Sequence, residues 1–186
     1  MSDDSGLRLR RLSTSDLSGA EVRAIRALMD VAFGPDVDDR FTEDDWQHAI
    51  GGMHFVLDVG DEIVAHASVV RRELHVDGQP LRTGYVEAVA TAPRRQRQGF
   101  GTVVMQDVGS YVRGGFQLGA LGTGSNGFYE RLGWLTWQGP SSVRTTSGAL
   151  MTPDDDGYIM VLRTSSSPAF ELTGPISCEW RPADVW

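Results

Sequence analysis

The sequence predicts an α+β fold, in which helices flank a central mixed, mostly antiparallel sheet. A short strand and two helical patterns open the chain, and a strand-rich stretch over residues 53–91 follows them. Within that stretch, Asp77–Gly78 is a strong hairpin signal and predicts antiparallel neighbours. A helical pattern over residues 99–113 and a strand pattern over 116–121 come next. This strand–helix–strand passage implies one parallel pair of strands with a right-handed crossover.

Local signals place the first elements. Apolar and basic residues alternate from Leu7 to Leu12, as in an edge strand. Ser18 is followed three residues later by a glutamate, which is a capping-box pattern and predicts that a helix begins there. Gly34 ends the apolar pattern of this helix. Thr42, followed three residues later by an aspartate, predicts a second helix that runs to residues 51–52.

The later elements follow from periodicity and from turn residues. Pro93 ends the third strand of the strand-rich stretch, because proline cannot donate to a sheet ladder. From residue 53 onward, the predicted elements in chain order are strands 53–59, 62–76 and 81–91, helix 99–113, strand 116–121, helix 125–132, and strands 134–138 and 158–162. With 186 residues and no linker-like shift in composition, the chain is expected to form a single domain over residues 1–186.

The net charge limits the classes of partner. Lys plus Arg number 17 and Asp plus Glu number 25, which gives a formal charge of −8. Nucleic acids and anionic membranes attract basic surfaces, so neither is an expected partner. An acidic cleft that steers a cationic substrate is compatible with this charge, and so is a merely soluble acidic surface.

Cysteine and histidine usage argues against disulfides and metals. Cys178 is the one cysteine, so an intrachain disulfide is excluded and a reducing cytoplasmic location is expected. No apolar run approaches the roughly 20 residues of a membrane span. The four histidines lack metal-ligand spacing, and a calcium loop starting at Asp154 would need a glutamate where Ser165 stands. We therefore expect no metal, and a structural role for Cys178.

The turn from Gln96 to Gly101 is the sharpest motif. It lies between a predicted strand and an amphipathic helix, and its two glycines allow a tight turn and close approach of a ligand. The N-terminus of a helix presents unsatisfied N–H groups and a positive dipole end, which suit a pyrophosphate. Arg94, Arg95 and Arg97 add positive charge. The alternative is an ordinary strand-to-helix turn with solvated arginines.

These residues resemble the GNAT superfamily of N-acetyltransferases. Gln96-x-x-Gly99-x-Gly101 matches the acetyl-CoA pyrophosphate loop of that superfamily, and Tyr129 falls in its Tyr-x-x-x-Gly-Trp element. The resemblance implies the GNAT fold and acetyl-CoA as cosubstrate. The cofactor-binding residues that it implies are Val89, Ala90, Thr91, Gln96, Arg97, Gln98, Gly99, Phe100 and Gly101.

A narrower resemblance covers nearly the whole chain. The segments Trp46…His54, Gly84–Glu87, Leu118–Leu121, Pro153–Gly157 and Asp184–Trp186 look like those of aminoglycoside 2′-N-acetyltransferases, in the same order. The resemblance implies acetylation of the 2′-amino group of an aminoglycoside, a role in antibiotic resistance, and a homodimer.

Two residues are candidates for proton transfer. On a strand, residues of one parity share a face, so Glu87 points the same way as Tyr85 and Val89. The resemblance implies that Glu87 is the general base, directly or through water, and that Tyr129 is the general acid for the leaving thiolate. The thioester oxygen is then polarised by a strand N–H, most readily that of Val89. The alternatives are a salt-bridge partner on the sheet for Glu87 and a core aromatic for Tyr129.

Recognition of a polyamine sugar calls for several carboxylates around one cleft. The substrate-binding residues that the resemblance implies are Asp39, Arg40, Asp45, Glu87, Ala88, Gly122, Asp154, Asp155, Asp184 and the main-chain carboxylate of Trp186. Two of these positions depart from the family. Arg40 stands where an aspartate is common, so Asp39 or Asp38 is expected to take that role, and Gly122 stands where a serine is common.

Two other functions compete with this reading. A GNAT enzyme for another amine, such as a small metabolite or a peptide N-terminus, would turn over non-sugar amines. A module that binds acetyl-CoA without transferring the acetyl group would release no thiol. The presence of Glu87 and Tyr129 speaks against the latter.

Overall fold

A computed structural model of the chain describes residues 6–34 and 40–186. The chain divides into two compact units, each containing segments that are distant in sequence. The first unit comprises Met1–Val70 and Val86–Val108, and the second comprises Arg71–Tyr85 and Gly109–Trp186. Strands β3 (Glu62–Val76) and β4 (Gln79–Thr91) and helix α3 (Phe100–Gly115) each contribute to both units.

The first unit begins with an antiparallel meander. Strand β1 (Leu7–Ser13) pairs with β2 (Met53–Val59), and β2 pairs with β3. The register between β2 and β3 shifts between Leu57 and Asp58, as at a β-bulge. The strands predicted over 53–59 and 62–76 are confirmed, and the edge-strand pattern at Leu7–Leu12 extends by one residue.

Capping boxes start helices α1 (Gly19–Phe33) and α2 (Glu43–Ala49). For α1, the Glu21 N–H donates to Ser18 Oγ at 3.2 Å and the Ser18 N–H donates to Glu21 Oε2 at 2.8 Å. Helix α2 repeats the arrangement with Thr42 and Asp45. Each box satisfies N–H groups that a helix start leaves without intrahelical partners.

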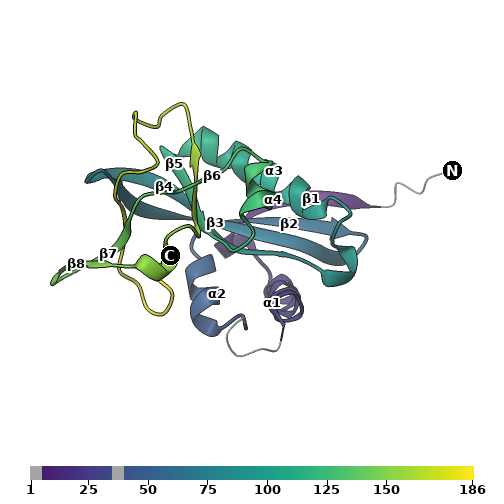
Figure 1. The fold of residues 1–186 in the computed structure, drawn as a ribbon. Helices are drawn as coiled ribbons and strands as arrows, with labels where there is room; N and C mark the ends of the chain where they lie inside the picture. Colours follow the sequence, from purple (N-terminus) through teal and green to yellow (C-terminus); the bar gives the residue numbers. More distant parts are fainter. Residues whose placement is uncertain (1–5, 35–39) are drawn as a thin grey trace. The chain divides into compact units, whose positions relative to one another are not determined.

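The two helices bury their apolar faces against the strands. Ile25 and Met29 of α1 and Trp46 of α2 pack with Val56 of β2, and all four are at most 6% exposed. Figure 1 shows α1 and α2 on the same side of β2 and β3. The far end of β4 joins this core, because Ala90 and Ala92 belong to the same cluster.

The second unit contains the parallel pairing that the sequence predicted. Strand β4 pairs in parallel with β5 (Leu118–Gly122). Strand β9 (Ile159–Arg163) pairs antiparallel with β5 and with the short strand β6 (Leu135–Thr136). Helix α4 (Asn126–Glu130) lies within the range predicted as a helix over 125–132.

Three strands of the second unit were not predicted. These are β7 (Ser141–Thr145), β8 (Gly148–Met151) and β10 (Ile176–Glu179). β7 pairs antiparallel with β8 and in parallel with β10, and β10 pairs antiparallel with β3. With both kinds of pairing and more antiparallel than parallel pairs, the predicted α+β fold is confirmed. Across the described residues, no helix has the length and apolar character to cross a membrane. The single domain remains a prediction.

Candidate active site

The backbone turns sharply between β4 and α3. After the 3-10 helix η2 (Pro93–Arg95), Arg97 has φ = 61° and Gly99 has φ = 87°. Left-handed residues within such a turn direct successive N–H groups toward one side and form an anion-binding concavity. Helix α3 begins directly afterwards at Phe100, so its first N–H groups and dipole add to the same preference. These features are compatible with the predicted binding of a pyrophosphate at this turn, which remains a prediction.

Polar side chains hold this turn together. Gln96 Nε2 donates to the Thr91 carbonyl at 3.3 Å, and Gln98 Nε2 donates to the Arg94 carbonyl at 3.1 Å. Arg94 and Arg95 both form ion pairs with Glu62. Two of the three arginines that were predicted to attract an anion are therefore already paired with a carboxylate, whereas Arg97 is exposed in the turn itself.

The last part of β4 presents alternate residues to the α1–α2 core. Ala90 is buried in that core and Ala88 packs against it. Glu87 and Val89 flank Ala88, and their sharing of the opposite face of the sheet remains a prediction. Glu87 is half-buried. Ala88 between them has φ = 48°, which interrupts the extended backbone at this one residue.

Tyr129 lies on α4 and is buried. Its ring meets Phe128 and Trp134 edge-on, with ring centroids 4.9 Å and 6.4 Å away. Burial raises the pKa of Tyr129 to about 12, although a hydrogen bond with the Thr123 side chain acts in the opposite direction. The phenol is thus protonated at neutral pH, as a general acid must be.

An acidic segment lies in the second unit. Asp154 and Asp155 lie on the 3-10 helix η3 (Pro153–Asp155), and the first is exposed while the second is half-buried. Burial raises the pKa of Asp155, and the negative charges of Asp184 and Asp154 raise it further. Asp155 and Asp184, predicted as substrate ligands from segments 29 positions apart, are thus close enough to repel each other.

Trp186 is anchored beside this segment. Its side chain is buried, and the indole N–H donates to Thr152 Oγ1 at 2.9 Å. Its N–H donates to Asp184 Oδ1 at 3.2 Å. A Cβ placed on Gly122 would lie 3.5 Å from the main-chain carbon of Trp186, so two further predicted ligands are neighbours.

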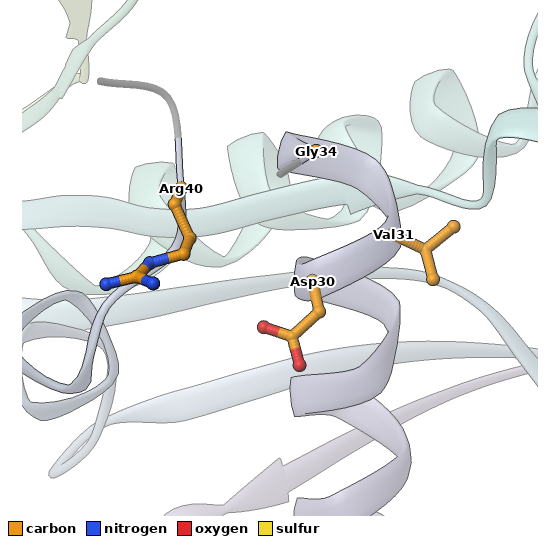
Figure 2. A pocket seen from close by; sticks show the side chains of 4 residues that line it. All are labelled: Asp30, Val31, Gly34 and Arg40. Atoms are coloured by element: carbon orange, nitrogen blue, oxygen red, sulfur yellow. The ribbon is translucent and has the colours of Figure 1, made fainter. Parts of the chain in front are cut away.

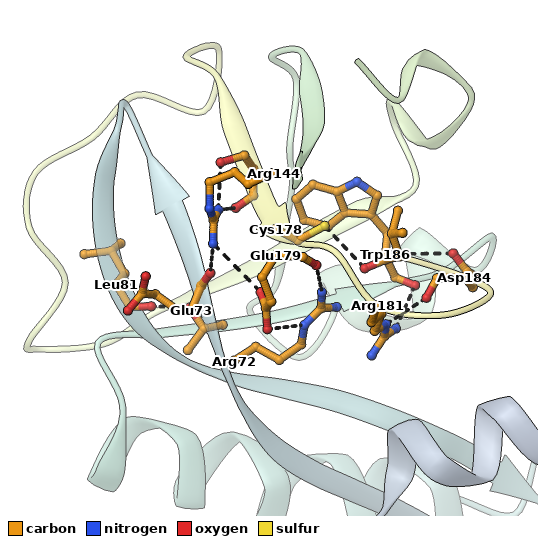
Figure 3. A network of polar contacts seen from close by, with 12 residues as sticks. Arg72, Glu73, Leu81, Arg144, Cys178, Glu179, Arg181, Asp184 and Trp186 are labelled. Carbon is orange, nitrogen blue, oxygen red and sulfur yellow. Dashed lines mark hydrogen bonds and ion pairs between the residues drawn. The ribbon is translucent and has the colours of Figure 1, made fainter. Parts of the chain in front are cut away.

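Arginines surround the chain end, and sequence analysis missed them. Arg181 Nη2 donates to the Trp186 main-chain oxygen at 3.2 Å (Figure 3). Arg181 also lies over the ring of Tyr85, at 5.4 Å from its centroid, and Arg72 lies over the same ring at 4.5 Å. Arg72 is buried. Its Nε donates to Glu179 Oε1 and its Nη2 donates to the Glu179 main-chain oxygen, both at 3.1 Å. No motif marks these residues, since the contacts of Arg72 with Glu179 and of Arg181 with Tyr85 join positions that are distant in sequence.

The remaining predicted ligands belong to the first unit. Asp45 uses its carboxylate to cap α2, with Oδ2 accepting from the N–H and the hydroxyl of Thr42, both at 2.7 Å. Arg40 is exposed and lines a pocket together with Asp30, Val31 and Gly34 (Figure 2). Asp38 and Asp39 lie outside the described residues. Among residues 6–34 and 40–186, no group of three or more His, Cys, Asp or Glu could hold a metal ion.

Known proteins similar to this chain share its fold and nearly its whole length. Residues 13–136 match the family model described as an acetyltransferase (GNAT) domain. An aminoglycoside 2′-N-acetyltransferase of Mycolicibacterium fortuitum is 41% identical over 181 residues, covering 95% of this chain and 91% of that protein.

Solved structures agree on the fold. A GNAT family acetyltransferase from Brucella melitensis in complex with acetyl-CoA has a TM-score of 0.61 at 17% identity, covering 92% of this chain and 94% of the other. A GNAT family N-acetyltransferase from Escherichia coli in complex with CoA has a TM-score of 0.65 at 14% identity, covering 94% and 92%. At these identities the likeness concerns the fold alone.

Proposed function

Because the chain belongs to the GNAT acetyltransferase family, we propose that it transfers the acetyl group of acetyl-CoA to the 2′-amino group of an aminoglycoside. One observation carries the proposal, namely that its likeness to a named aminoglycoside 2′-N-acetyltransferase extends over 95% of the chain. A likeness of that length is not restricted to the cofactor loop, and it therefore bears on the acceptor amine as well.

The reaction is a direct transfer. The neutral amine attacks the thioester carbonyl, a C–N bond forms, and the C–S bond breaks. Glu87 accepts the proton that the amine gives up, directly or through water, and Tyr129 donates a proton to the leaving thiolate. The N–H of Val89 polarises the thioester oxygen. The turn Gln96–Gly101 binds the pyrophosphate of the cosubstrate, and its two left-handed residues support this role.

Carboxylates recognise the cationic sugar. Asp154, Asp155, Asp184 and the main-chain carboxylate of Trp186 are the proposed ligands. Burial raises the pKa of Asp155 most, and repulsion by Asp184 raises it further; ammonium groups placed between the carboxylates would relieve that repulsion, which supports this assignment. Gly122 gives the substrate room beside Trp186, and Ala88, next to Glu87 in the chain, is a further proposed ligand. Asp45 and Asp39 are proposed as further ligands.

The second candidate is a GNAT enzyme for another amine. Arg40 favours it, because an exposed cation stands where the aminoglycoside enzymes commonly have an aspartate. A reducing cytoplasmic location, a homodimer and a role in antibiotic resistance are further predictions for the aminoglycoside enzyme.

The test compares aminoglycosides that carry either an amine or a hydroxyl at the 2′ carbon. CoA release from acetyl-CoA is measured with each member of such a pair. Turnover with the 2′-amine alone is the expected result. Turnover with both would retain acetyl transfer and reject the 2′ position. Turnover with neither, despite measurable binding of acetyl-CoA, would shift the assignment to the other amine.

A further inference from the structure

A series of hydrogen bonds through two buried histidines leads from Thr14, just after β1, to Ala88 in the last part of β4. His66 Nδ1 lies 2.8 Å from the Ala88 carbonyl oxygen, and His66 Nε2 lies 2.9 Å from His54 Nδ1. His54 Nε2 in turn lies 2.9 Å from Thr14 Oγ1. Thr14 Oγ1 also accepts from the Gly51 N–H at 2.8 Å. All of these residues belong to the first unit.

The Ala88 carbonyl at one end of this series of hydrogen bonds sets the donor and the acceptor in each of them. The Ala88 carbonyl can only accept, so His66 carries its proton on Nδ1. In a neutral ring the other nitrogen is then an acceptor, so His66 Nε2 accepts from His54 Nδ1–H. By the same reasoning, His54 Nε2 accepts from the Thr14 hydroxyl at 2.9 Å, which is nearer than the other acceptor of that hydroxyl, the Gly52 carbonyl at 3.3 Å. The hydrogen bonds are therefore consistent with one tautomer at each histidine, in which Nδ1 carries the proton.

Both rings are neutral in the folded protein. Each histidine is 0% exposed, and burial lowers the pKa of His54 to about 4 and that of His66 to about 3. Their ring centroids are 5.2 Å apart, which leaves no room for solvent between the bonded nitrogens. Apolar side chains in these buried positions would need no hydrogen-bond partners, whereas two buried histidines destabilise the fold unless their ring nitrogens are paired.

The series of hydrogen bonds ends at Ala88, whose backbone is strained. Ala88 has φ = 48°, a conformation that the Cβ of an alanine disfavours. The residues on either side are Glu87 and Val89, for which we proposed proton transfer and polarisation of the thioester. A change in the backbone angles of Ala88 would re-aim both at once.

We propose that His66, supported by His54 and Thr14, is a positioning residue that holds the Ala88 carbonyl and thereby fixes the backbone turn between Glu87 and Val89. This inference rests on the proposed function for its catalytic consequence, but not for its geometry. His66 acts through the backbone of β4 and is not assigned any contact with a substrate.

A matched pair of substitutions separates positioning from packing. His66→Asn places an amide N–H where Nδ1–H stands and keeps the donor to Ala88, whereas His66→Leu removes it. We expect His66→Leu to lower kcat roughly 10- to 100-fold, as misplacement of reacting groups by about 1 Å does, while the dissociation constant for acetyl-CoA changes less than threefold. His66→Asn should recover most of the lost kcat. Equal kcat for the two variants would overturn the proposal.

Two measurements keep the test decisive if His66→Leu fails to fold or if the wild-type chain turns over none of the amines. The first is ¹⁵N NMR of the histidine rings in the wild-type chain, where Nδ1–H tautomers at both His54 and His66 support the proposal and an Nε2–H tautomer at His66 overturns it. The second is the backbone ¹³C shifts of Ala88 in Thr14→Val and Thr14→Ser. A shift away from the left-handed values in the valine variant alone supports the proposal, and unchanged shifts in both overturn it. Neither measurement depends on the substrate.

Discussion

Arg181 Nη2 donates a hydrogen bond to the main-chain oxygen of Trp186 over 3.2 Å, while its Nε donates to the main-chain oxygen of Asp184 over 2.7 Å. The guanidinium of Arg181 therefore holds the main-chain oxygens of both Asp184 and Trp186. The oxygen that Arg181 holds is part of the carboxylate proposed to bind an aminoglycoside. An ammonium group at this position would share that carboxylate with Arg181, so the geometry of the carboxylate is set before the substrate arrives.

Moving the carboxylate away from Trp186 should weaken substrate binding. Adding one glycine after Trp186 turns the carboxylate into a peptide carbonyl, and a charge-assisted bond worth about 1.5–3 kcal/mol is lost. We expect KM for the aminoglycoside to rise roughly 10- to 100-fold, with KM for acetyl-CoA unchanged, in steady-state kinetics. Trp186→Phe is the control, since it keeps the carboxylate while losing the indole bond to Thr152 and part of the buried ring, which costs stability but leaves the charge in place. Equal KM values for the extended and wild-type chains would remove the carboxylate as a ligand.

Glu87→Gln should slow the chemical step. The amide keeps the size of the side chain but cannot accept the proton of the amine, so kcat should fall about 10²- to 10⁴-fold. Acetyl-CoA affinity, measured by calorimetry, should stay within a factor of two. Glu171→Gln is the control, because Glu171 is exposed and outside the proposed site. An unchanged kcat in the Glu87 variant would assign the base to another group.

Tyr129→Phe should reveal the general acid. The loss of the hydroxyl should lower kcat by about 10²-fold or more, and Tyr111→Phe on α3 should leave kcat unchanged. Since the pKa of Tyr129 is raised to about 12, the phenol stays protonated well above neutral pH. The wild-type kcat should therefore show no falling limb from this residue between pH 7 and pH 10. A falling limb in that range that disappears in Tyr129→Phe would contradict the assigned pKa.

The first half of the fold could be predicted because its signals are local. The capping boxes at Ser18 and Thr42 and the hairpin at Asp77–Gly78 are read from residues three or fewer positions apart, and all are present. The tight turn at Gln96–Gly101 belongs to the same class, since its positive φ at Gly99 requires a glycine-tolerant position.

The missing strands depend on distant partners. The buried positions of β7 alternate but include Ser141, so its sequence shows no apolar alternation, and β8 is exposed along its whole length and has no apolar face to mark it. Their pairing is fixed through β10, more than 20 residues further along the chain. The arginines around Tyr85 and the histidine chain were missed for the same reason, as His54 and His66 were considered only as metal ligands and their bond spans 12 positions.

Gly99→Ala should show whether binding of acetyl-CoA depends on the left-handed backbone conformation at Gly99, because an added side chain there would clash with nothing. A Cβ on Gly99 would meet no atom within 4 Å, so the cost arises from φ = 87° alone and should be about 1 kcal/mol. We expect acetyl-CoA affinity to fall several-fold, because the turn would shift to a conformation that an alanine accepts. Gly114→Ala is a matched control with open space and no positive φ, and it should leave the affinity unchanged. Equal acetyl-CoA affinities in calorimetry would show that the turn tolerates a side chain.

The stability of the chain should fall below pH 6.5 because of His54 and His66. Their folded pKa values of about 4 and about 3 lie below the ordinary value of 6.5, so the unfolded chain binds more protons between these limits. The stabilisation is complete above pH 6.5 and is lost as the pH falls, with a limiting slope of about 1.4 kcal/mol per pH unit for each histidine.

The range from pH 6.5 to pH 4.5 isolates the two histidines from carboxylates with lowered pKa. Glu21, for example, has its pKa lowered to about 2 by Arg10, so its contribution is lost only below its ordinary value of 4.5. Urea unfolding of the wild-type chain and of His54→Asn at each pH gives the difference in unfolding free energy, from which groups common to both chains cancel. We expect this difference to shrink as the pH falls from 6.5 to 4.5, because one of the two histidines no longer contributes in the variant. A difference that stays constant over this range would mean that His54 titrates alike in the folded and unfolded chains, and would contradict a buried neutral ring.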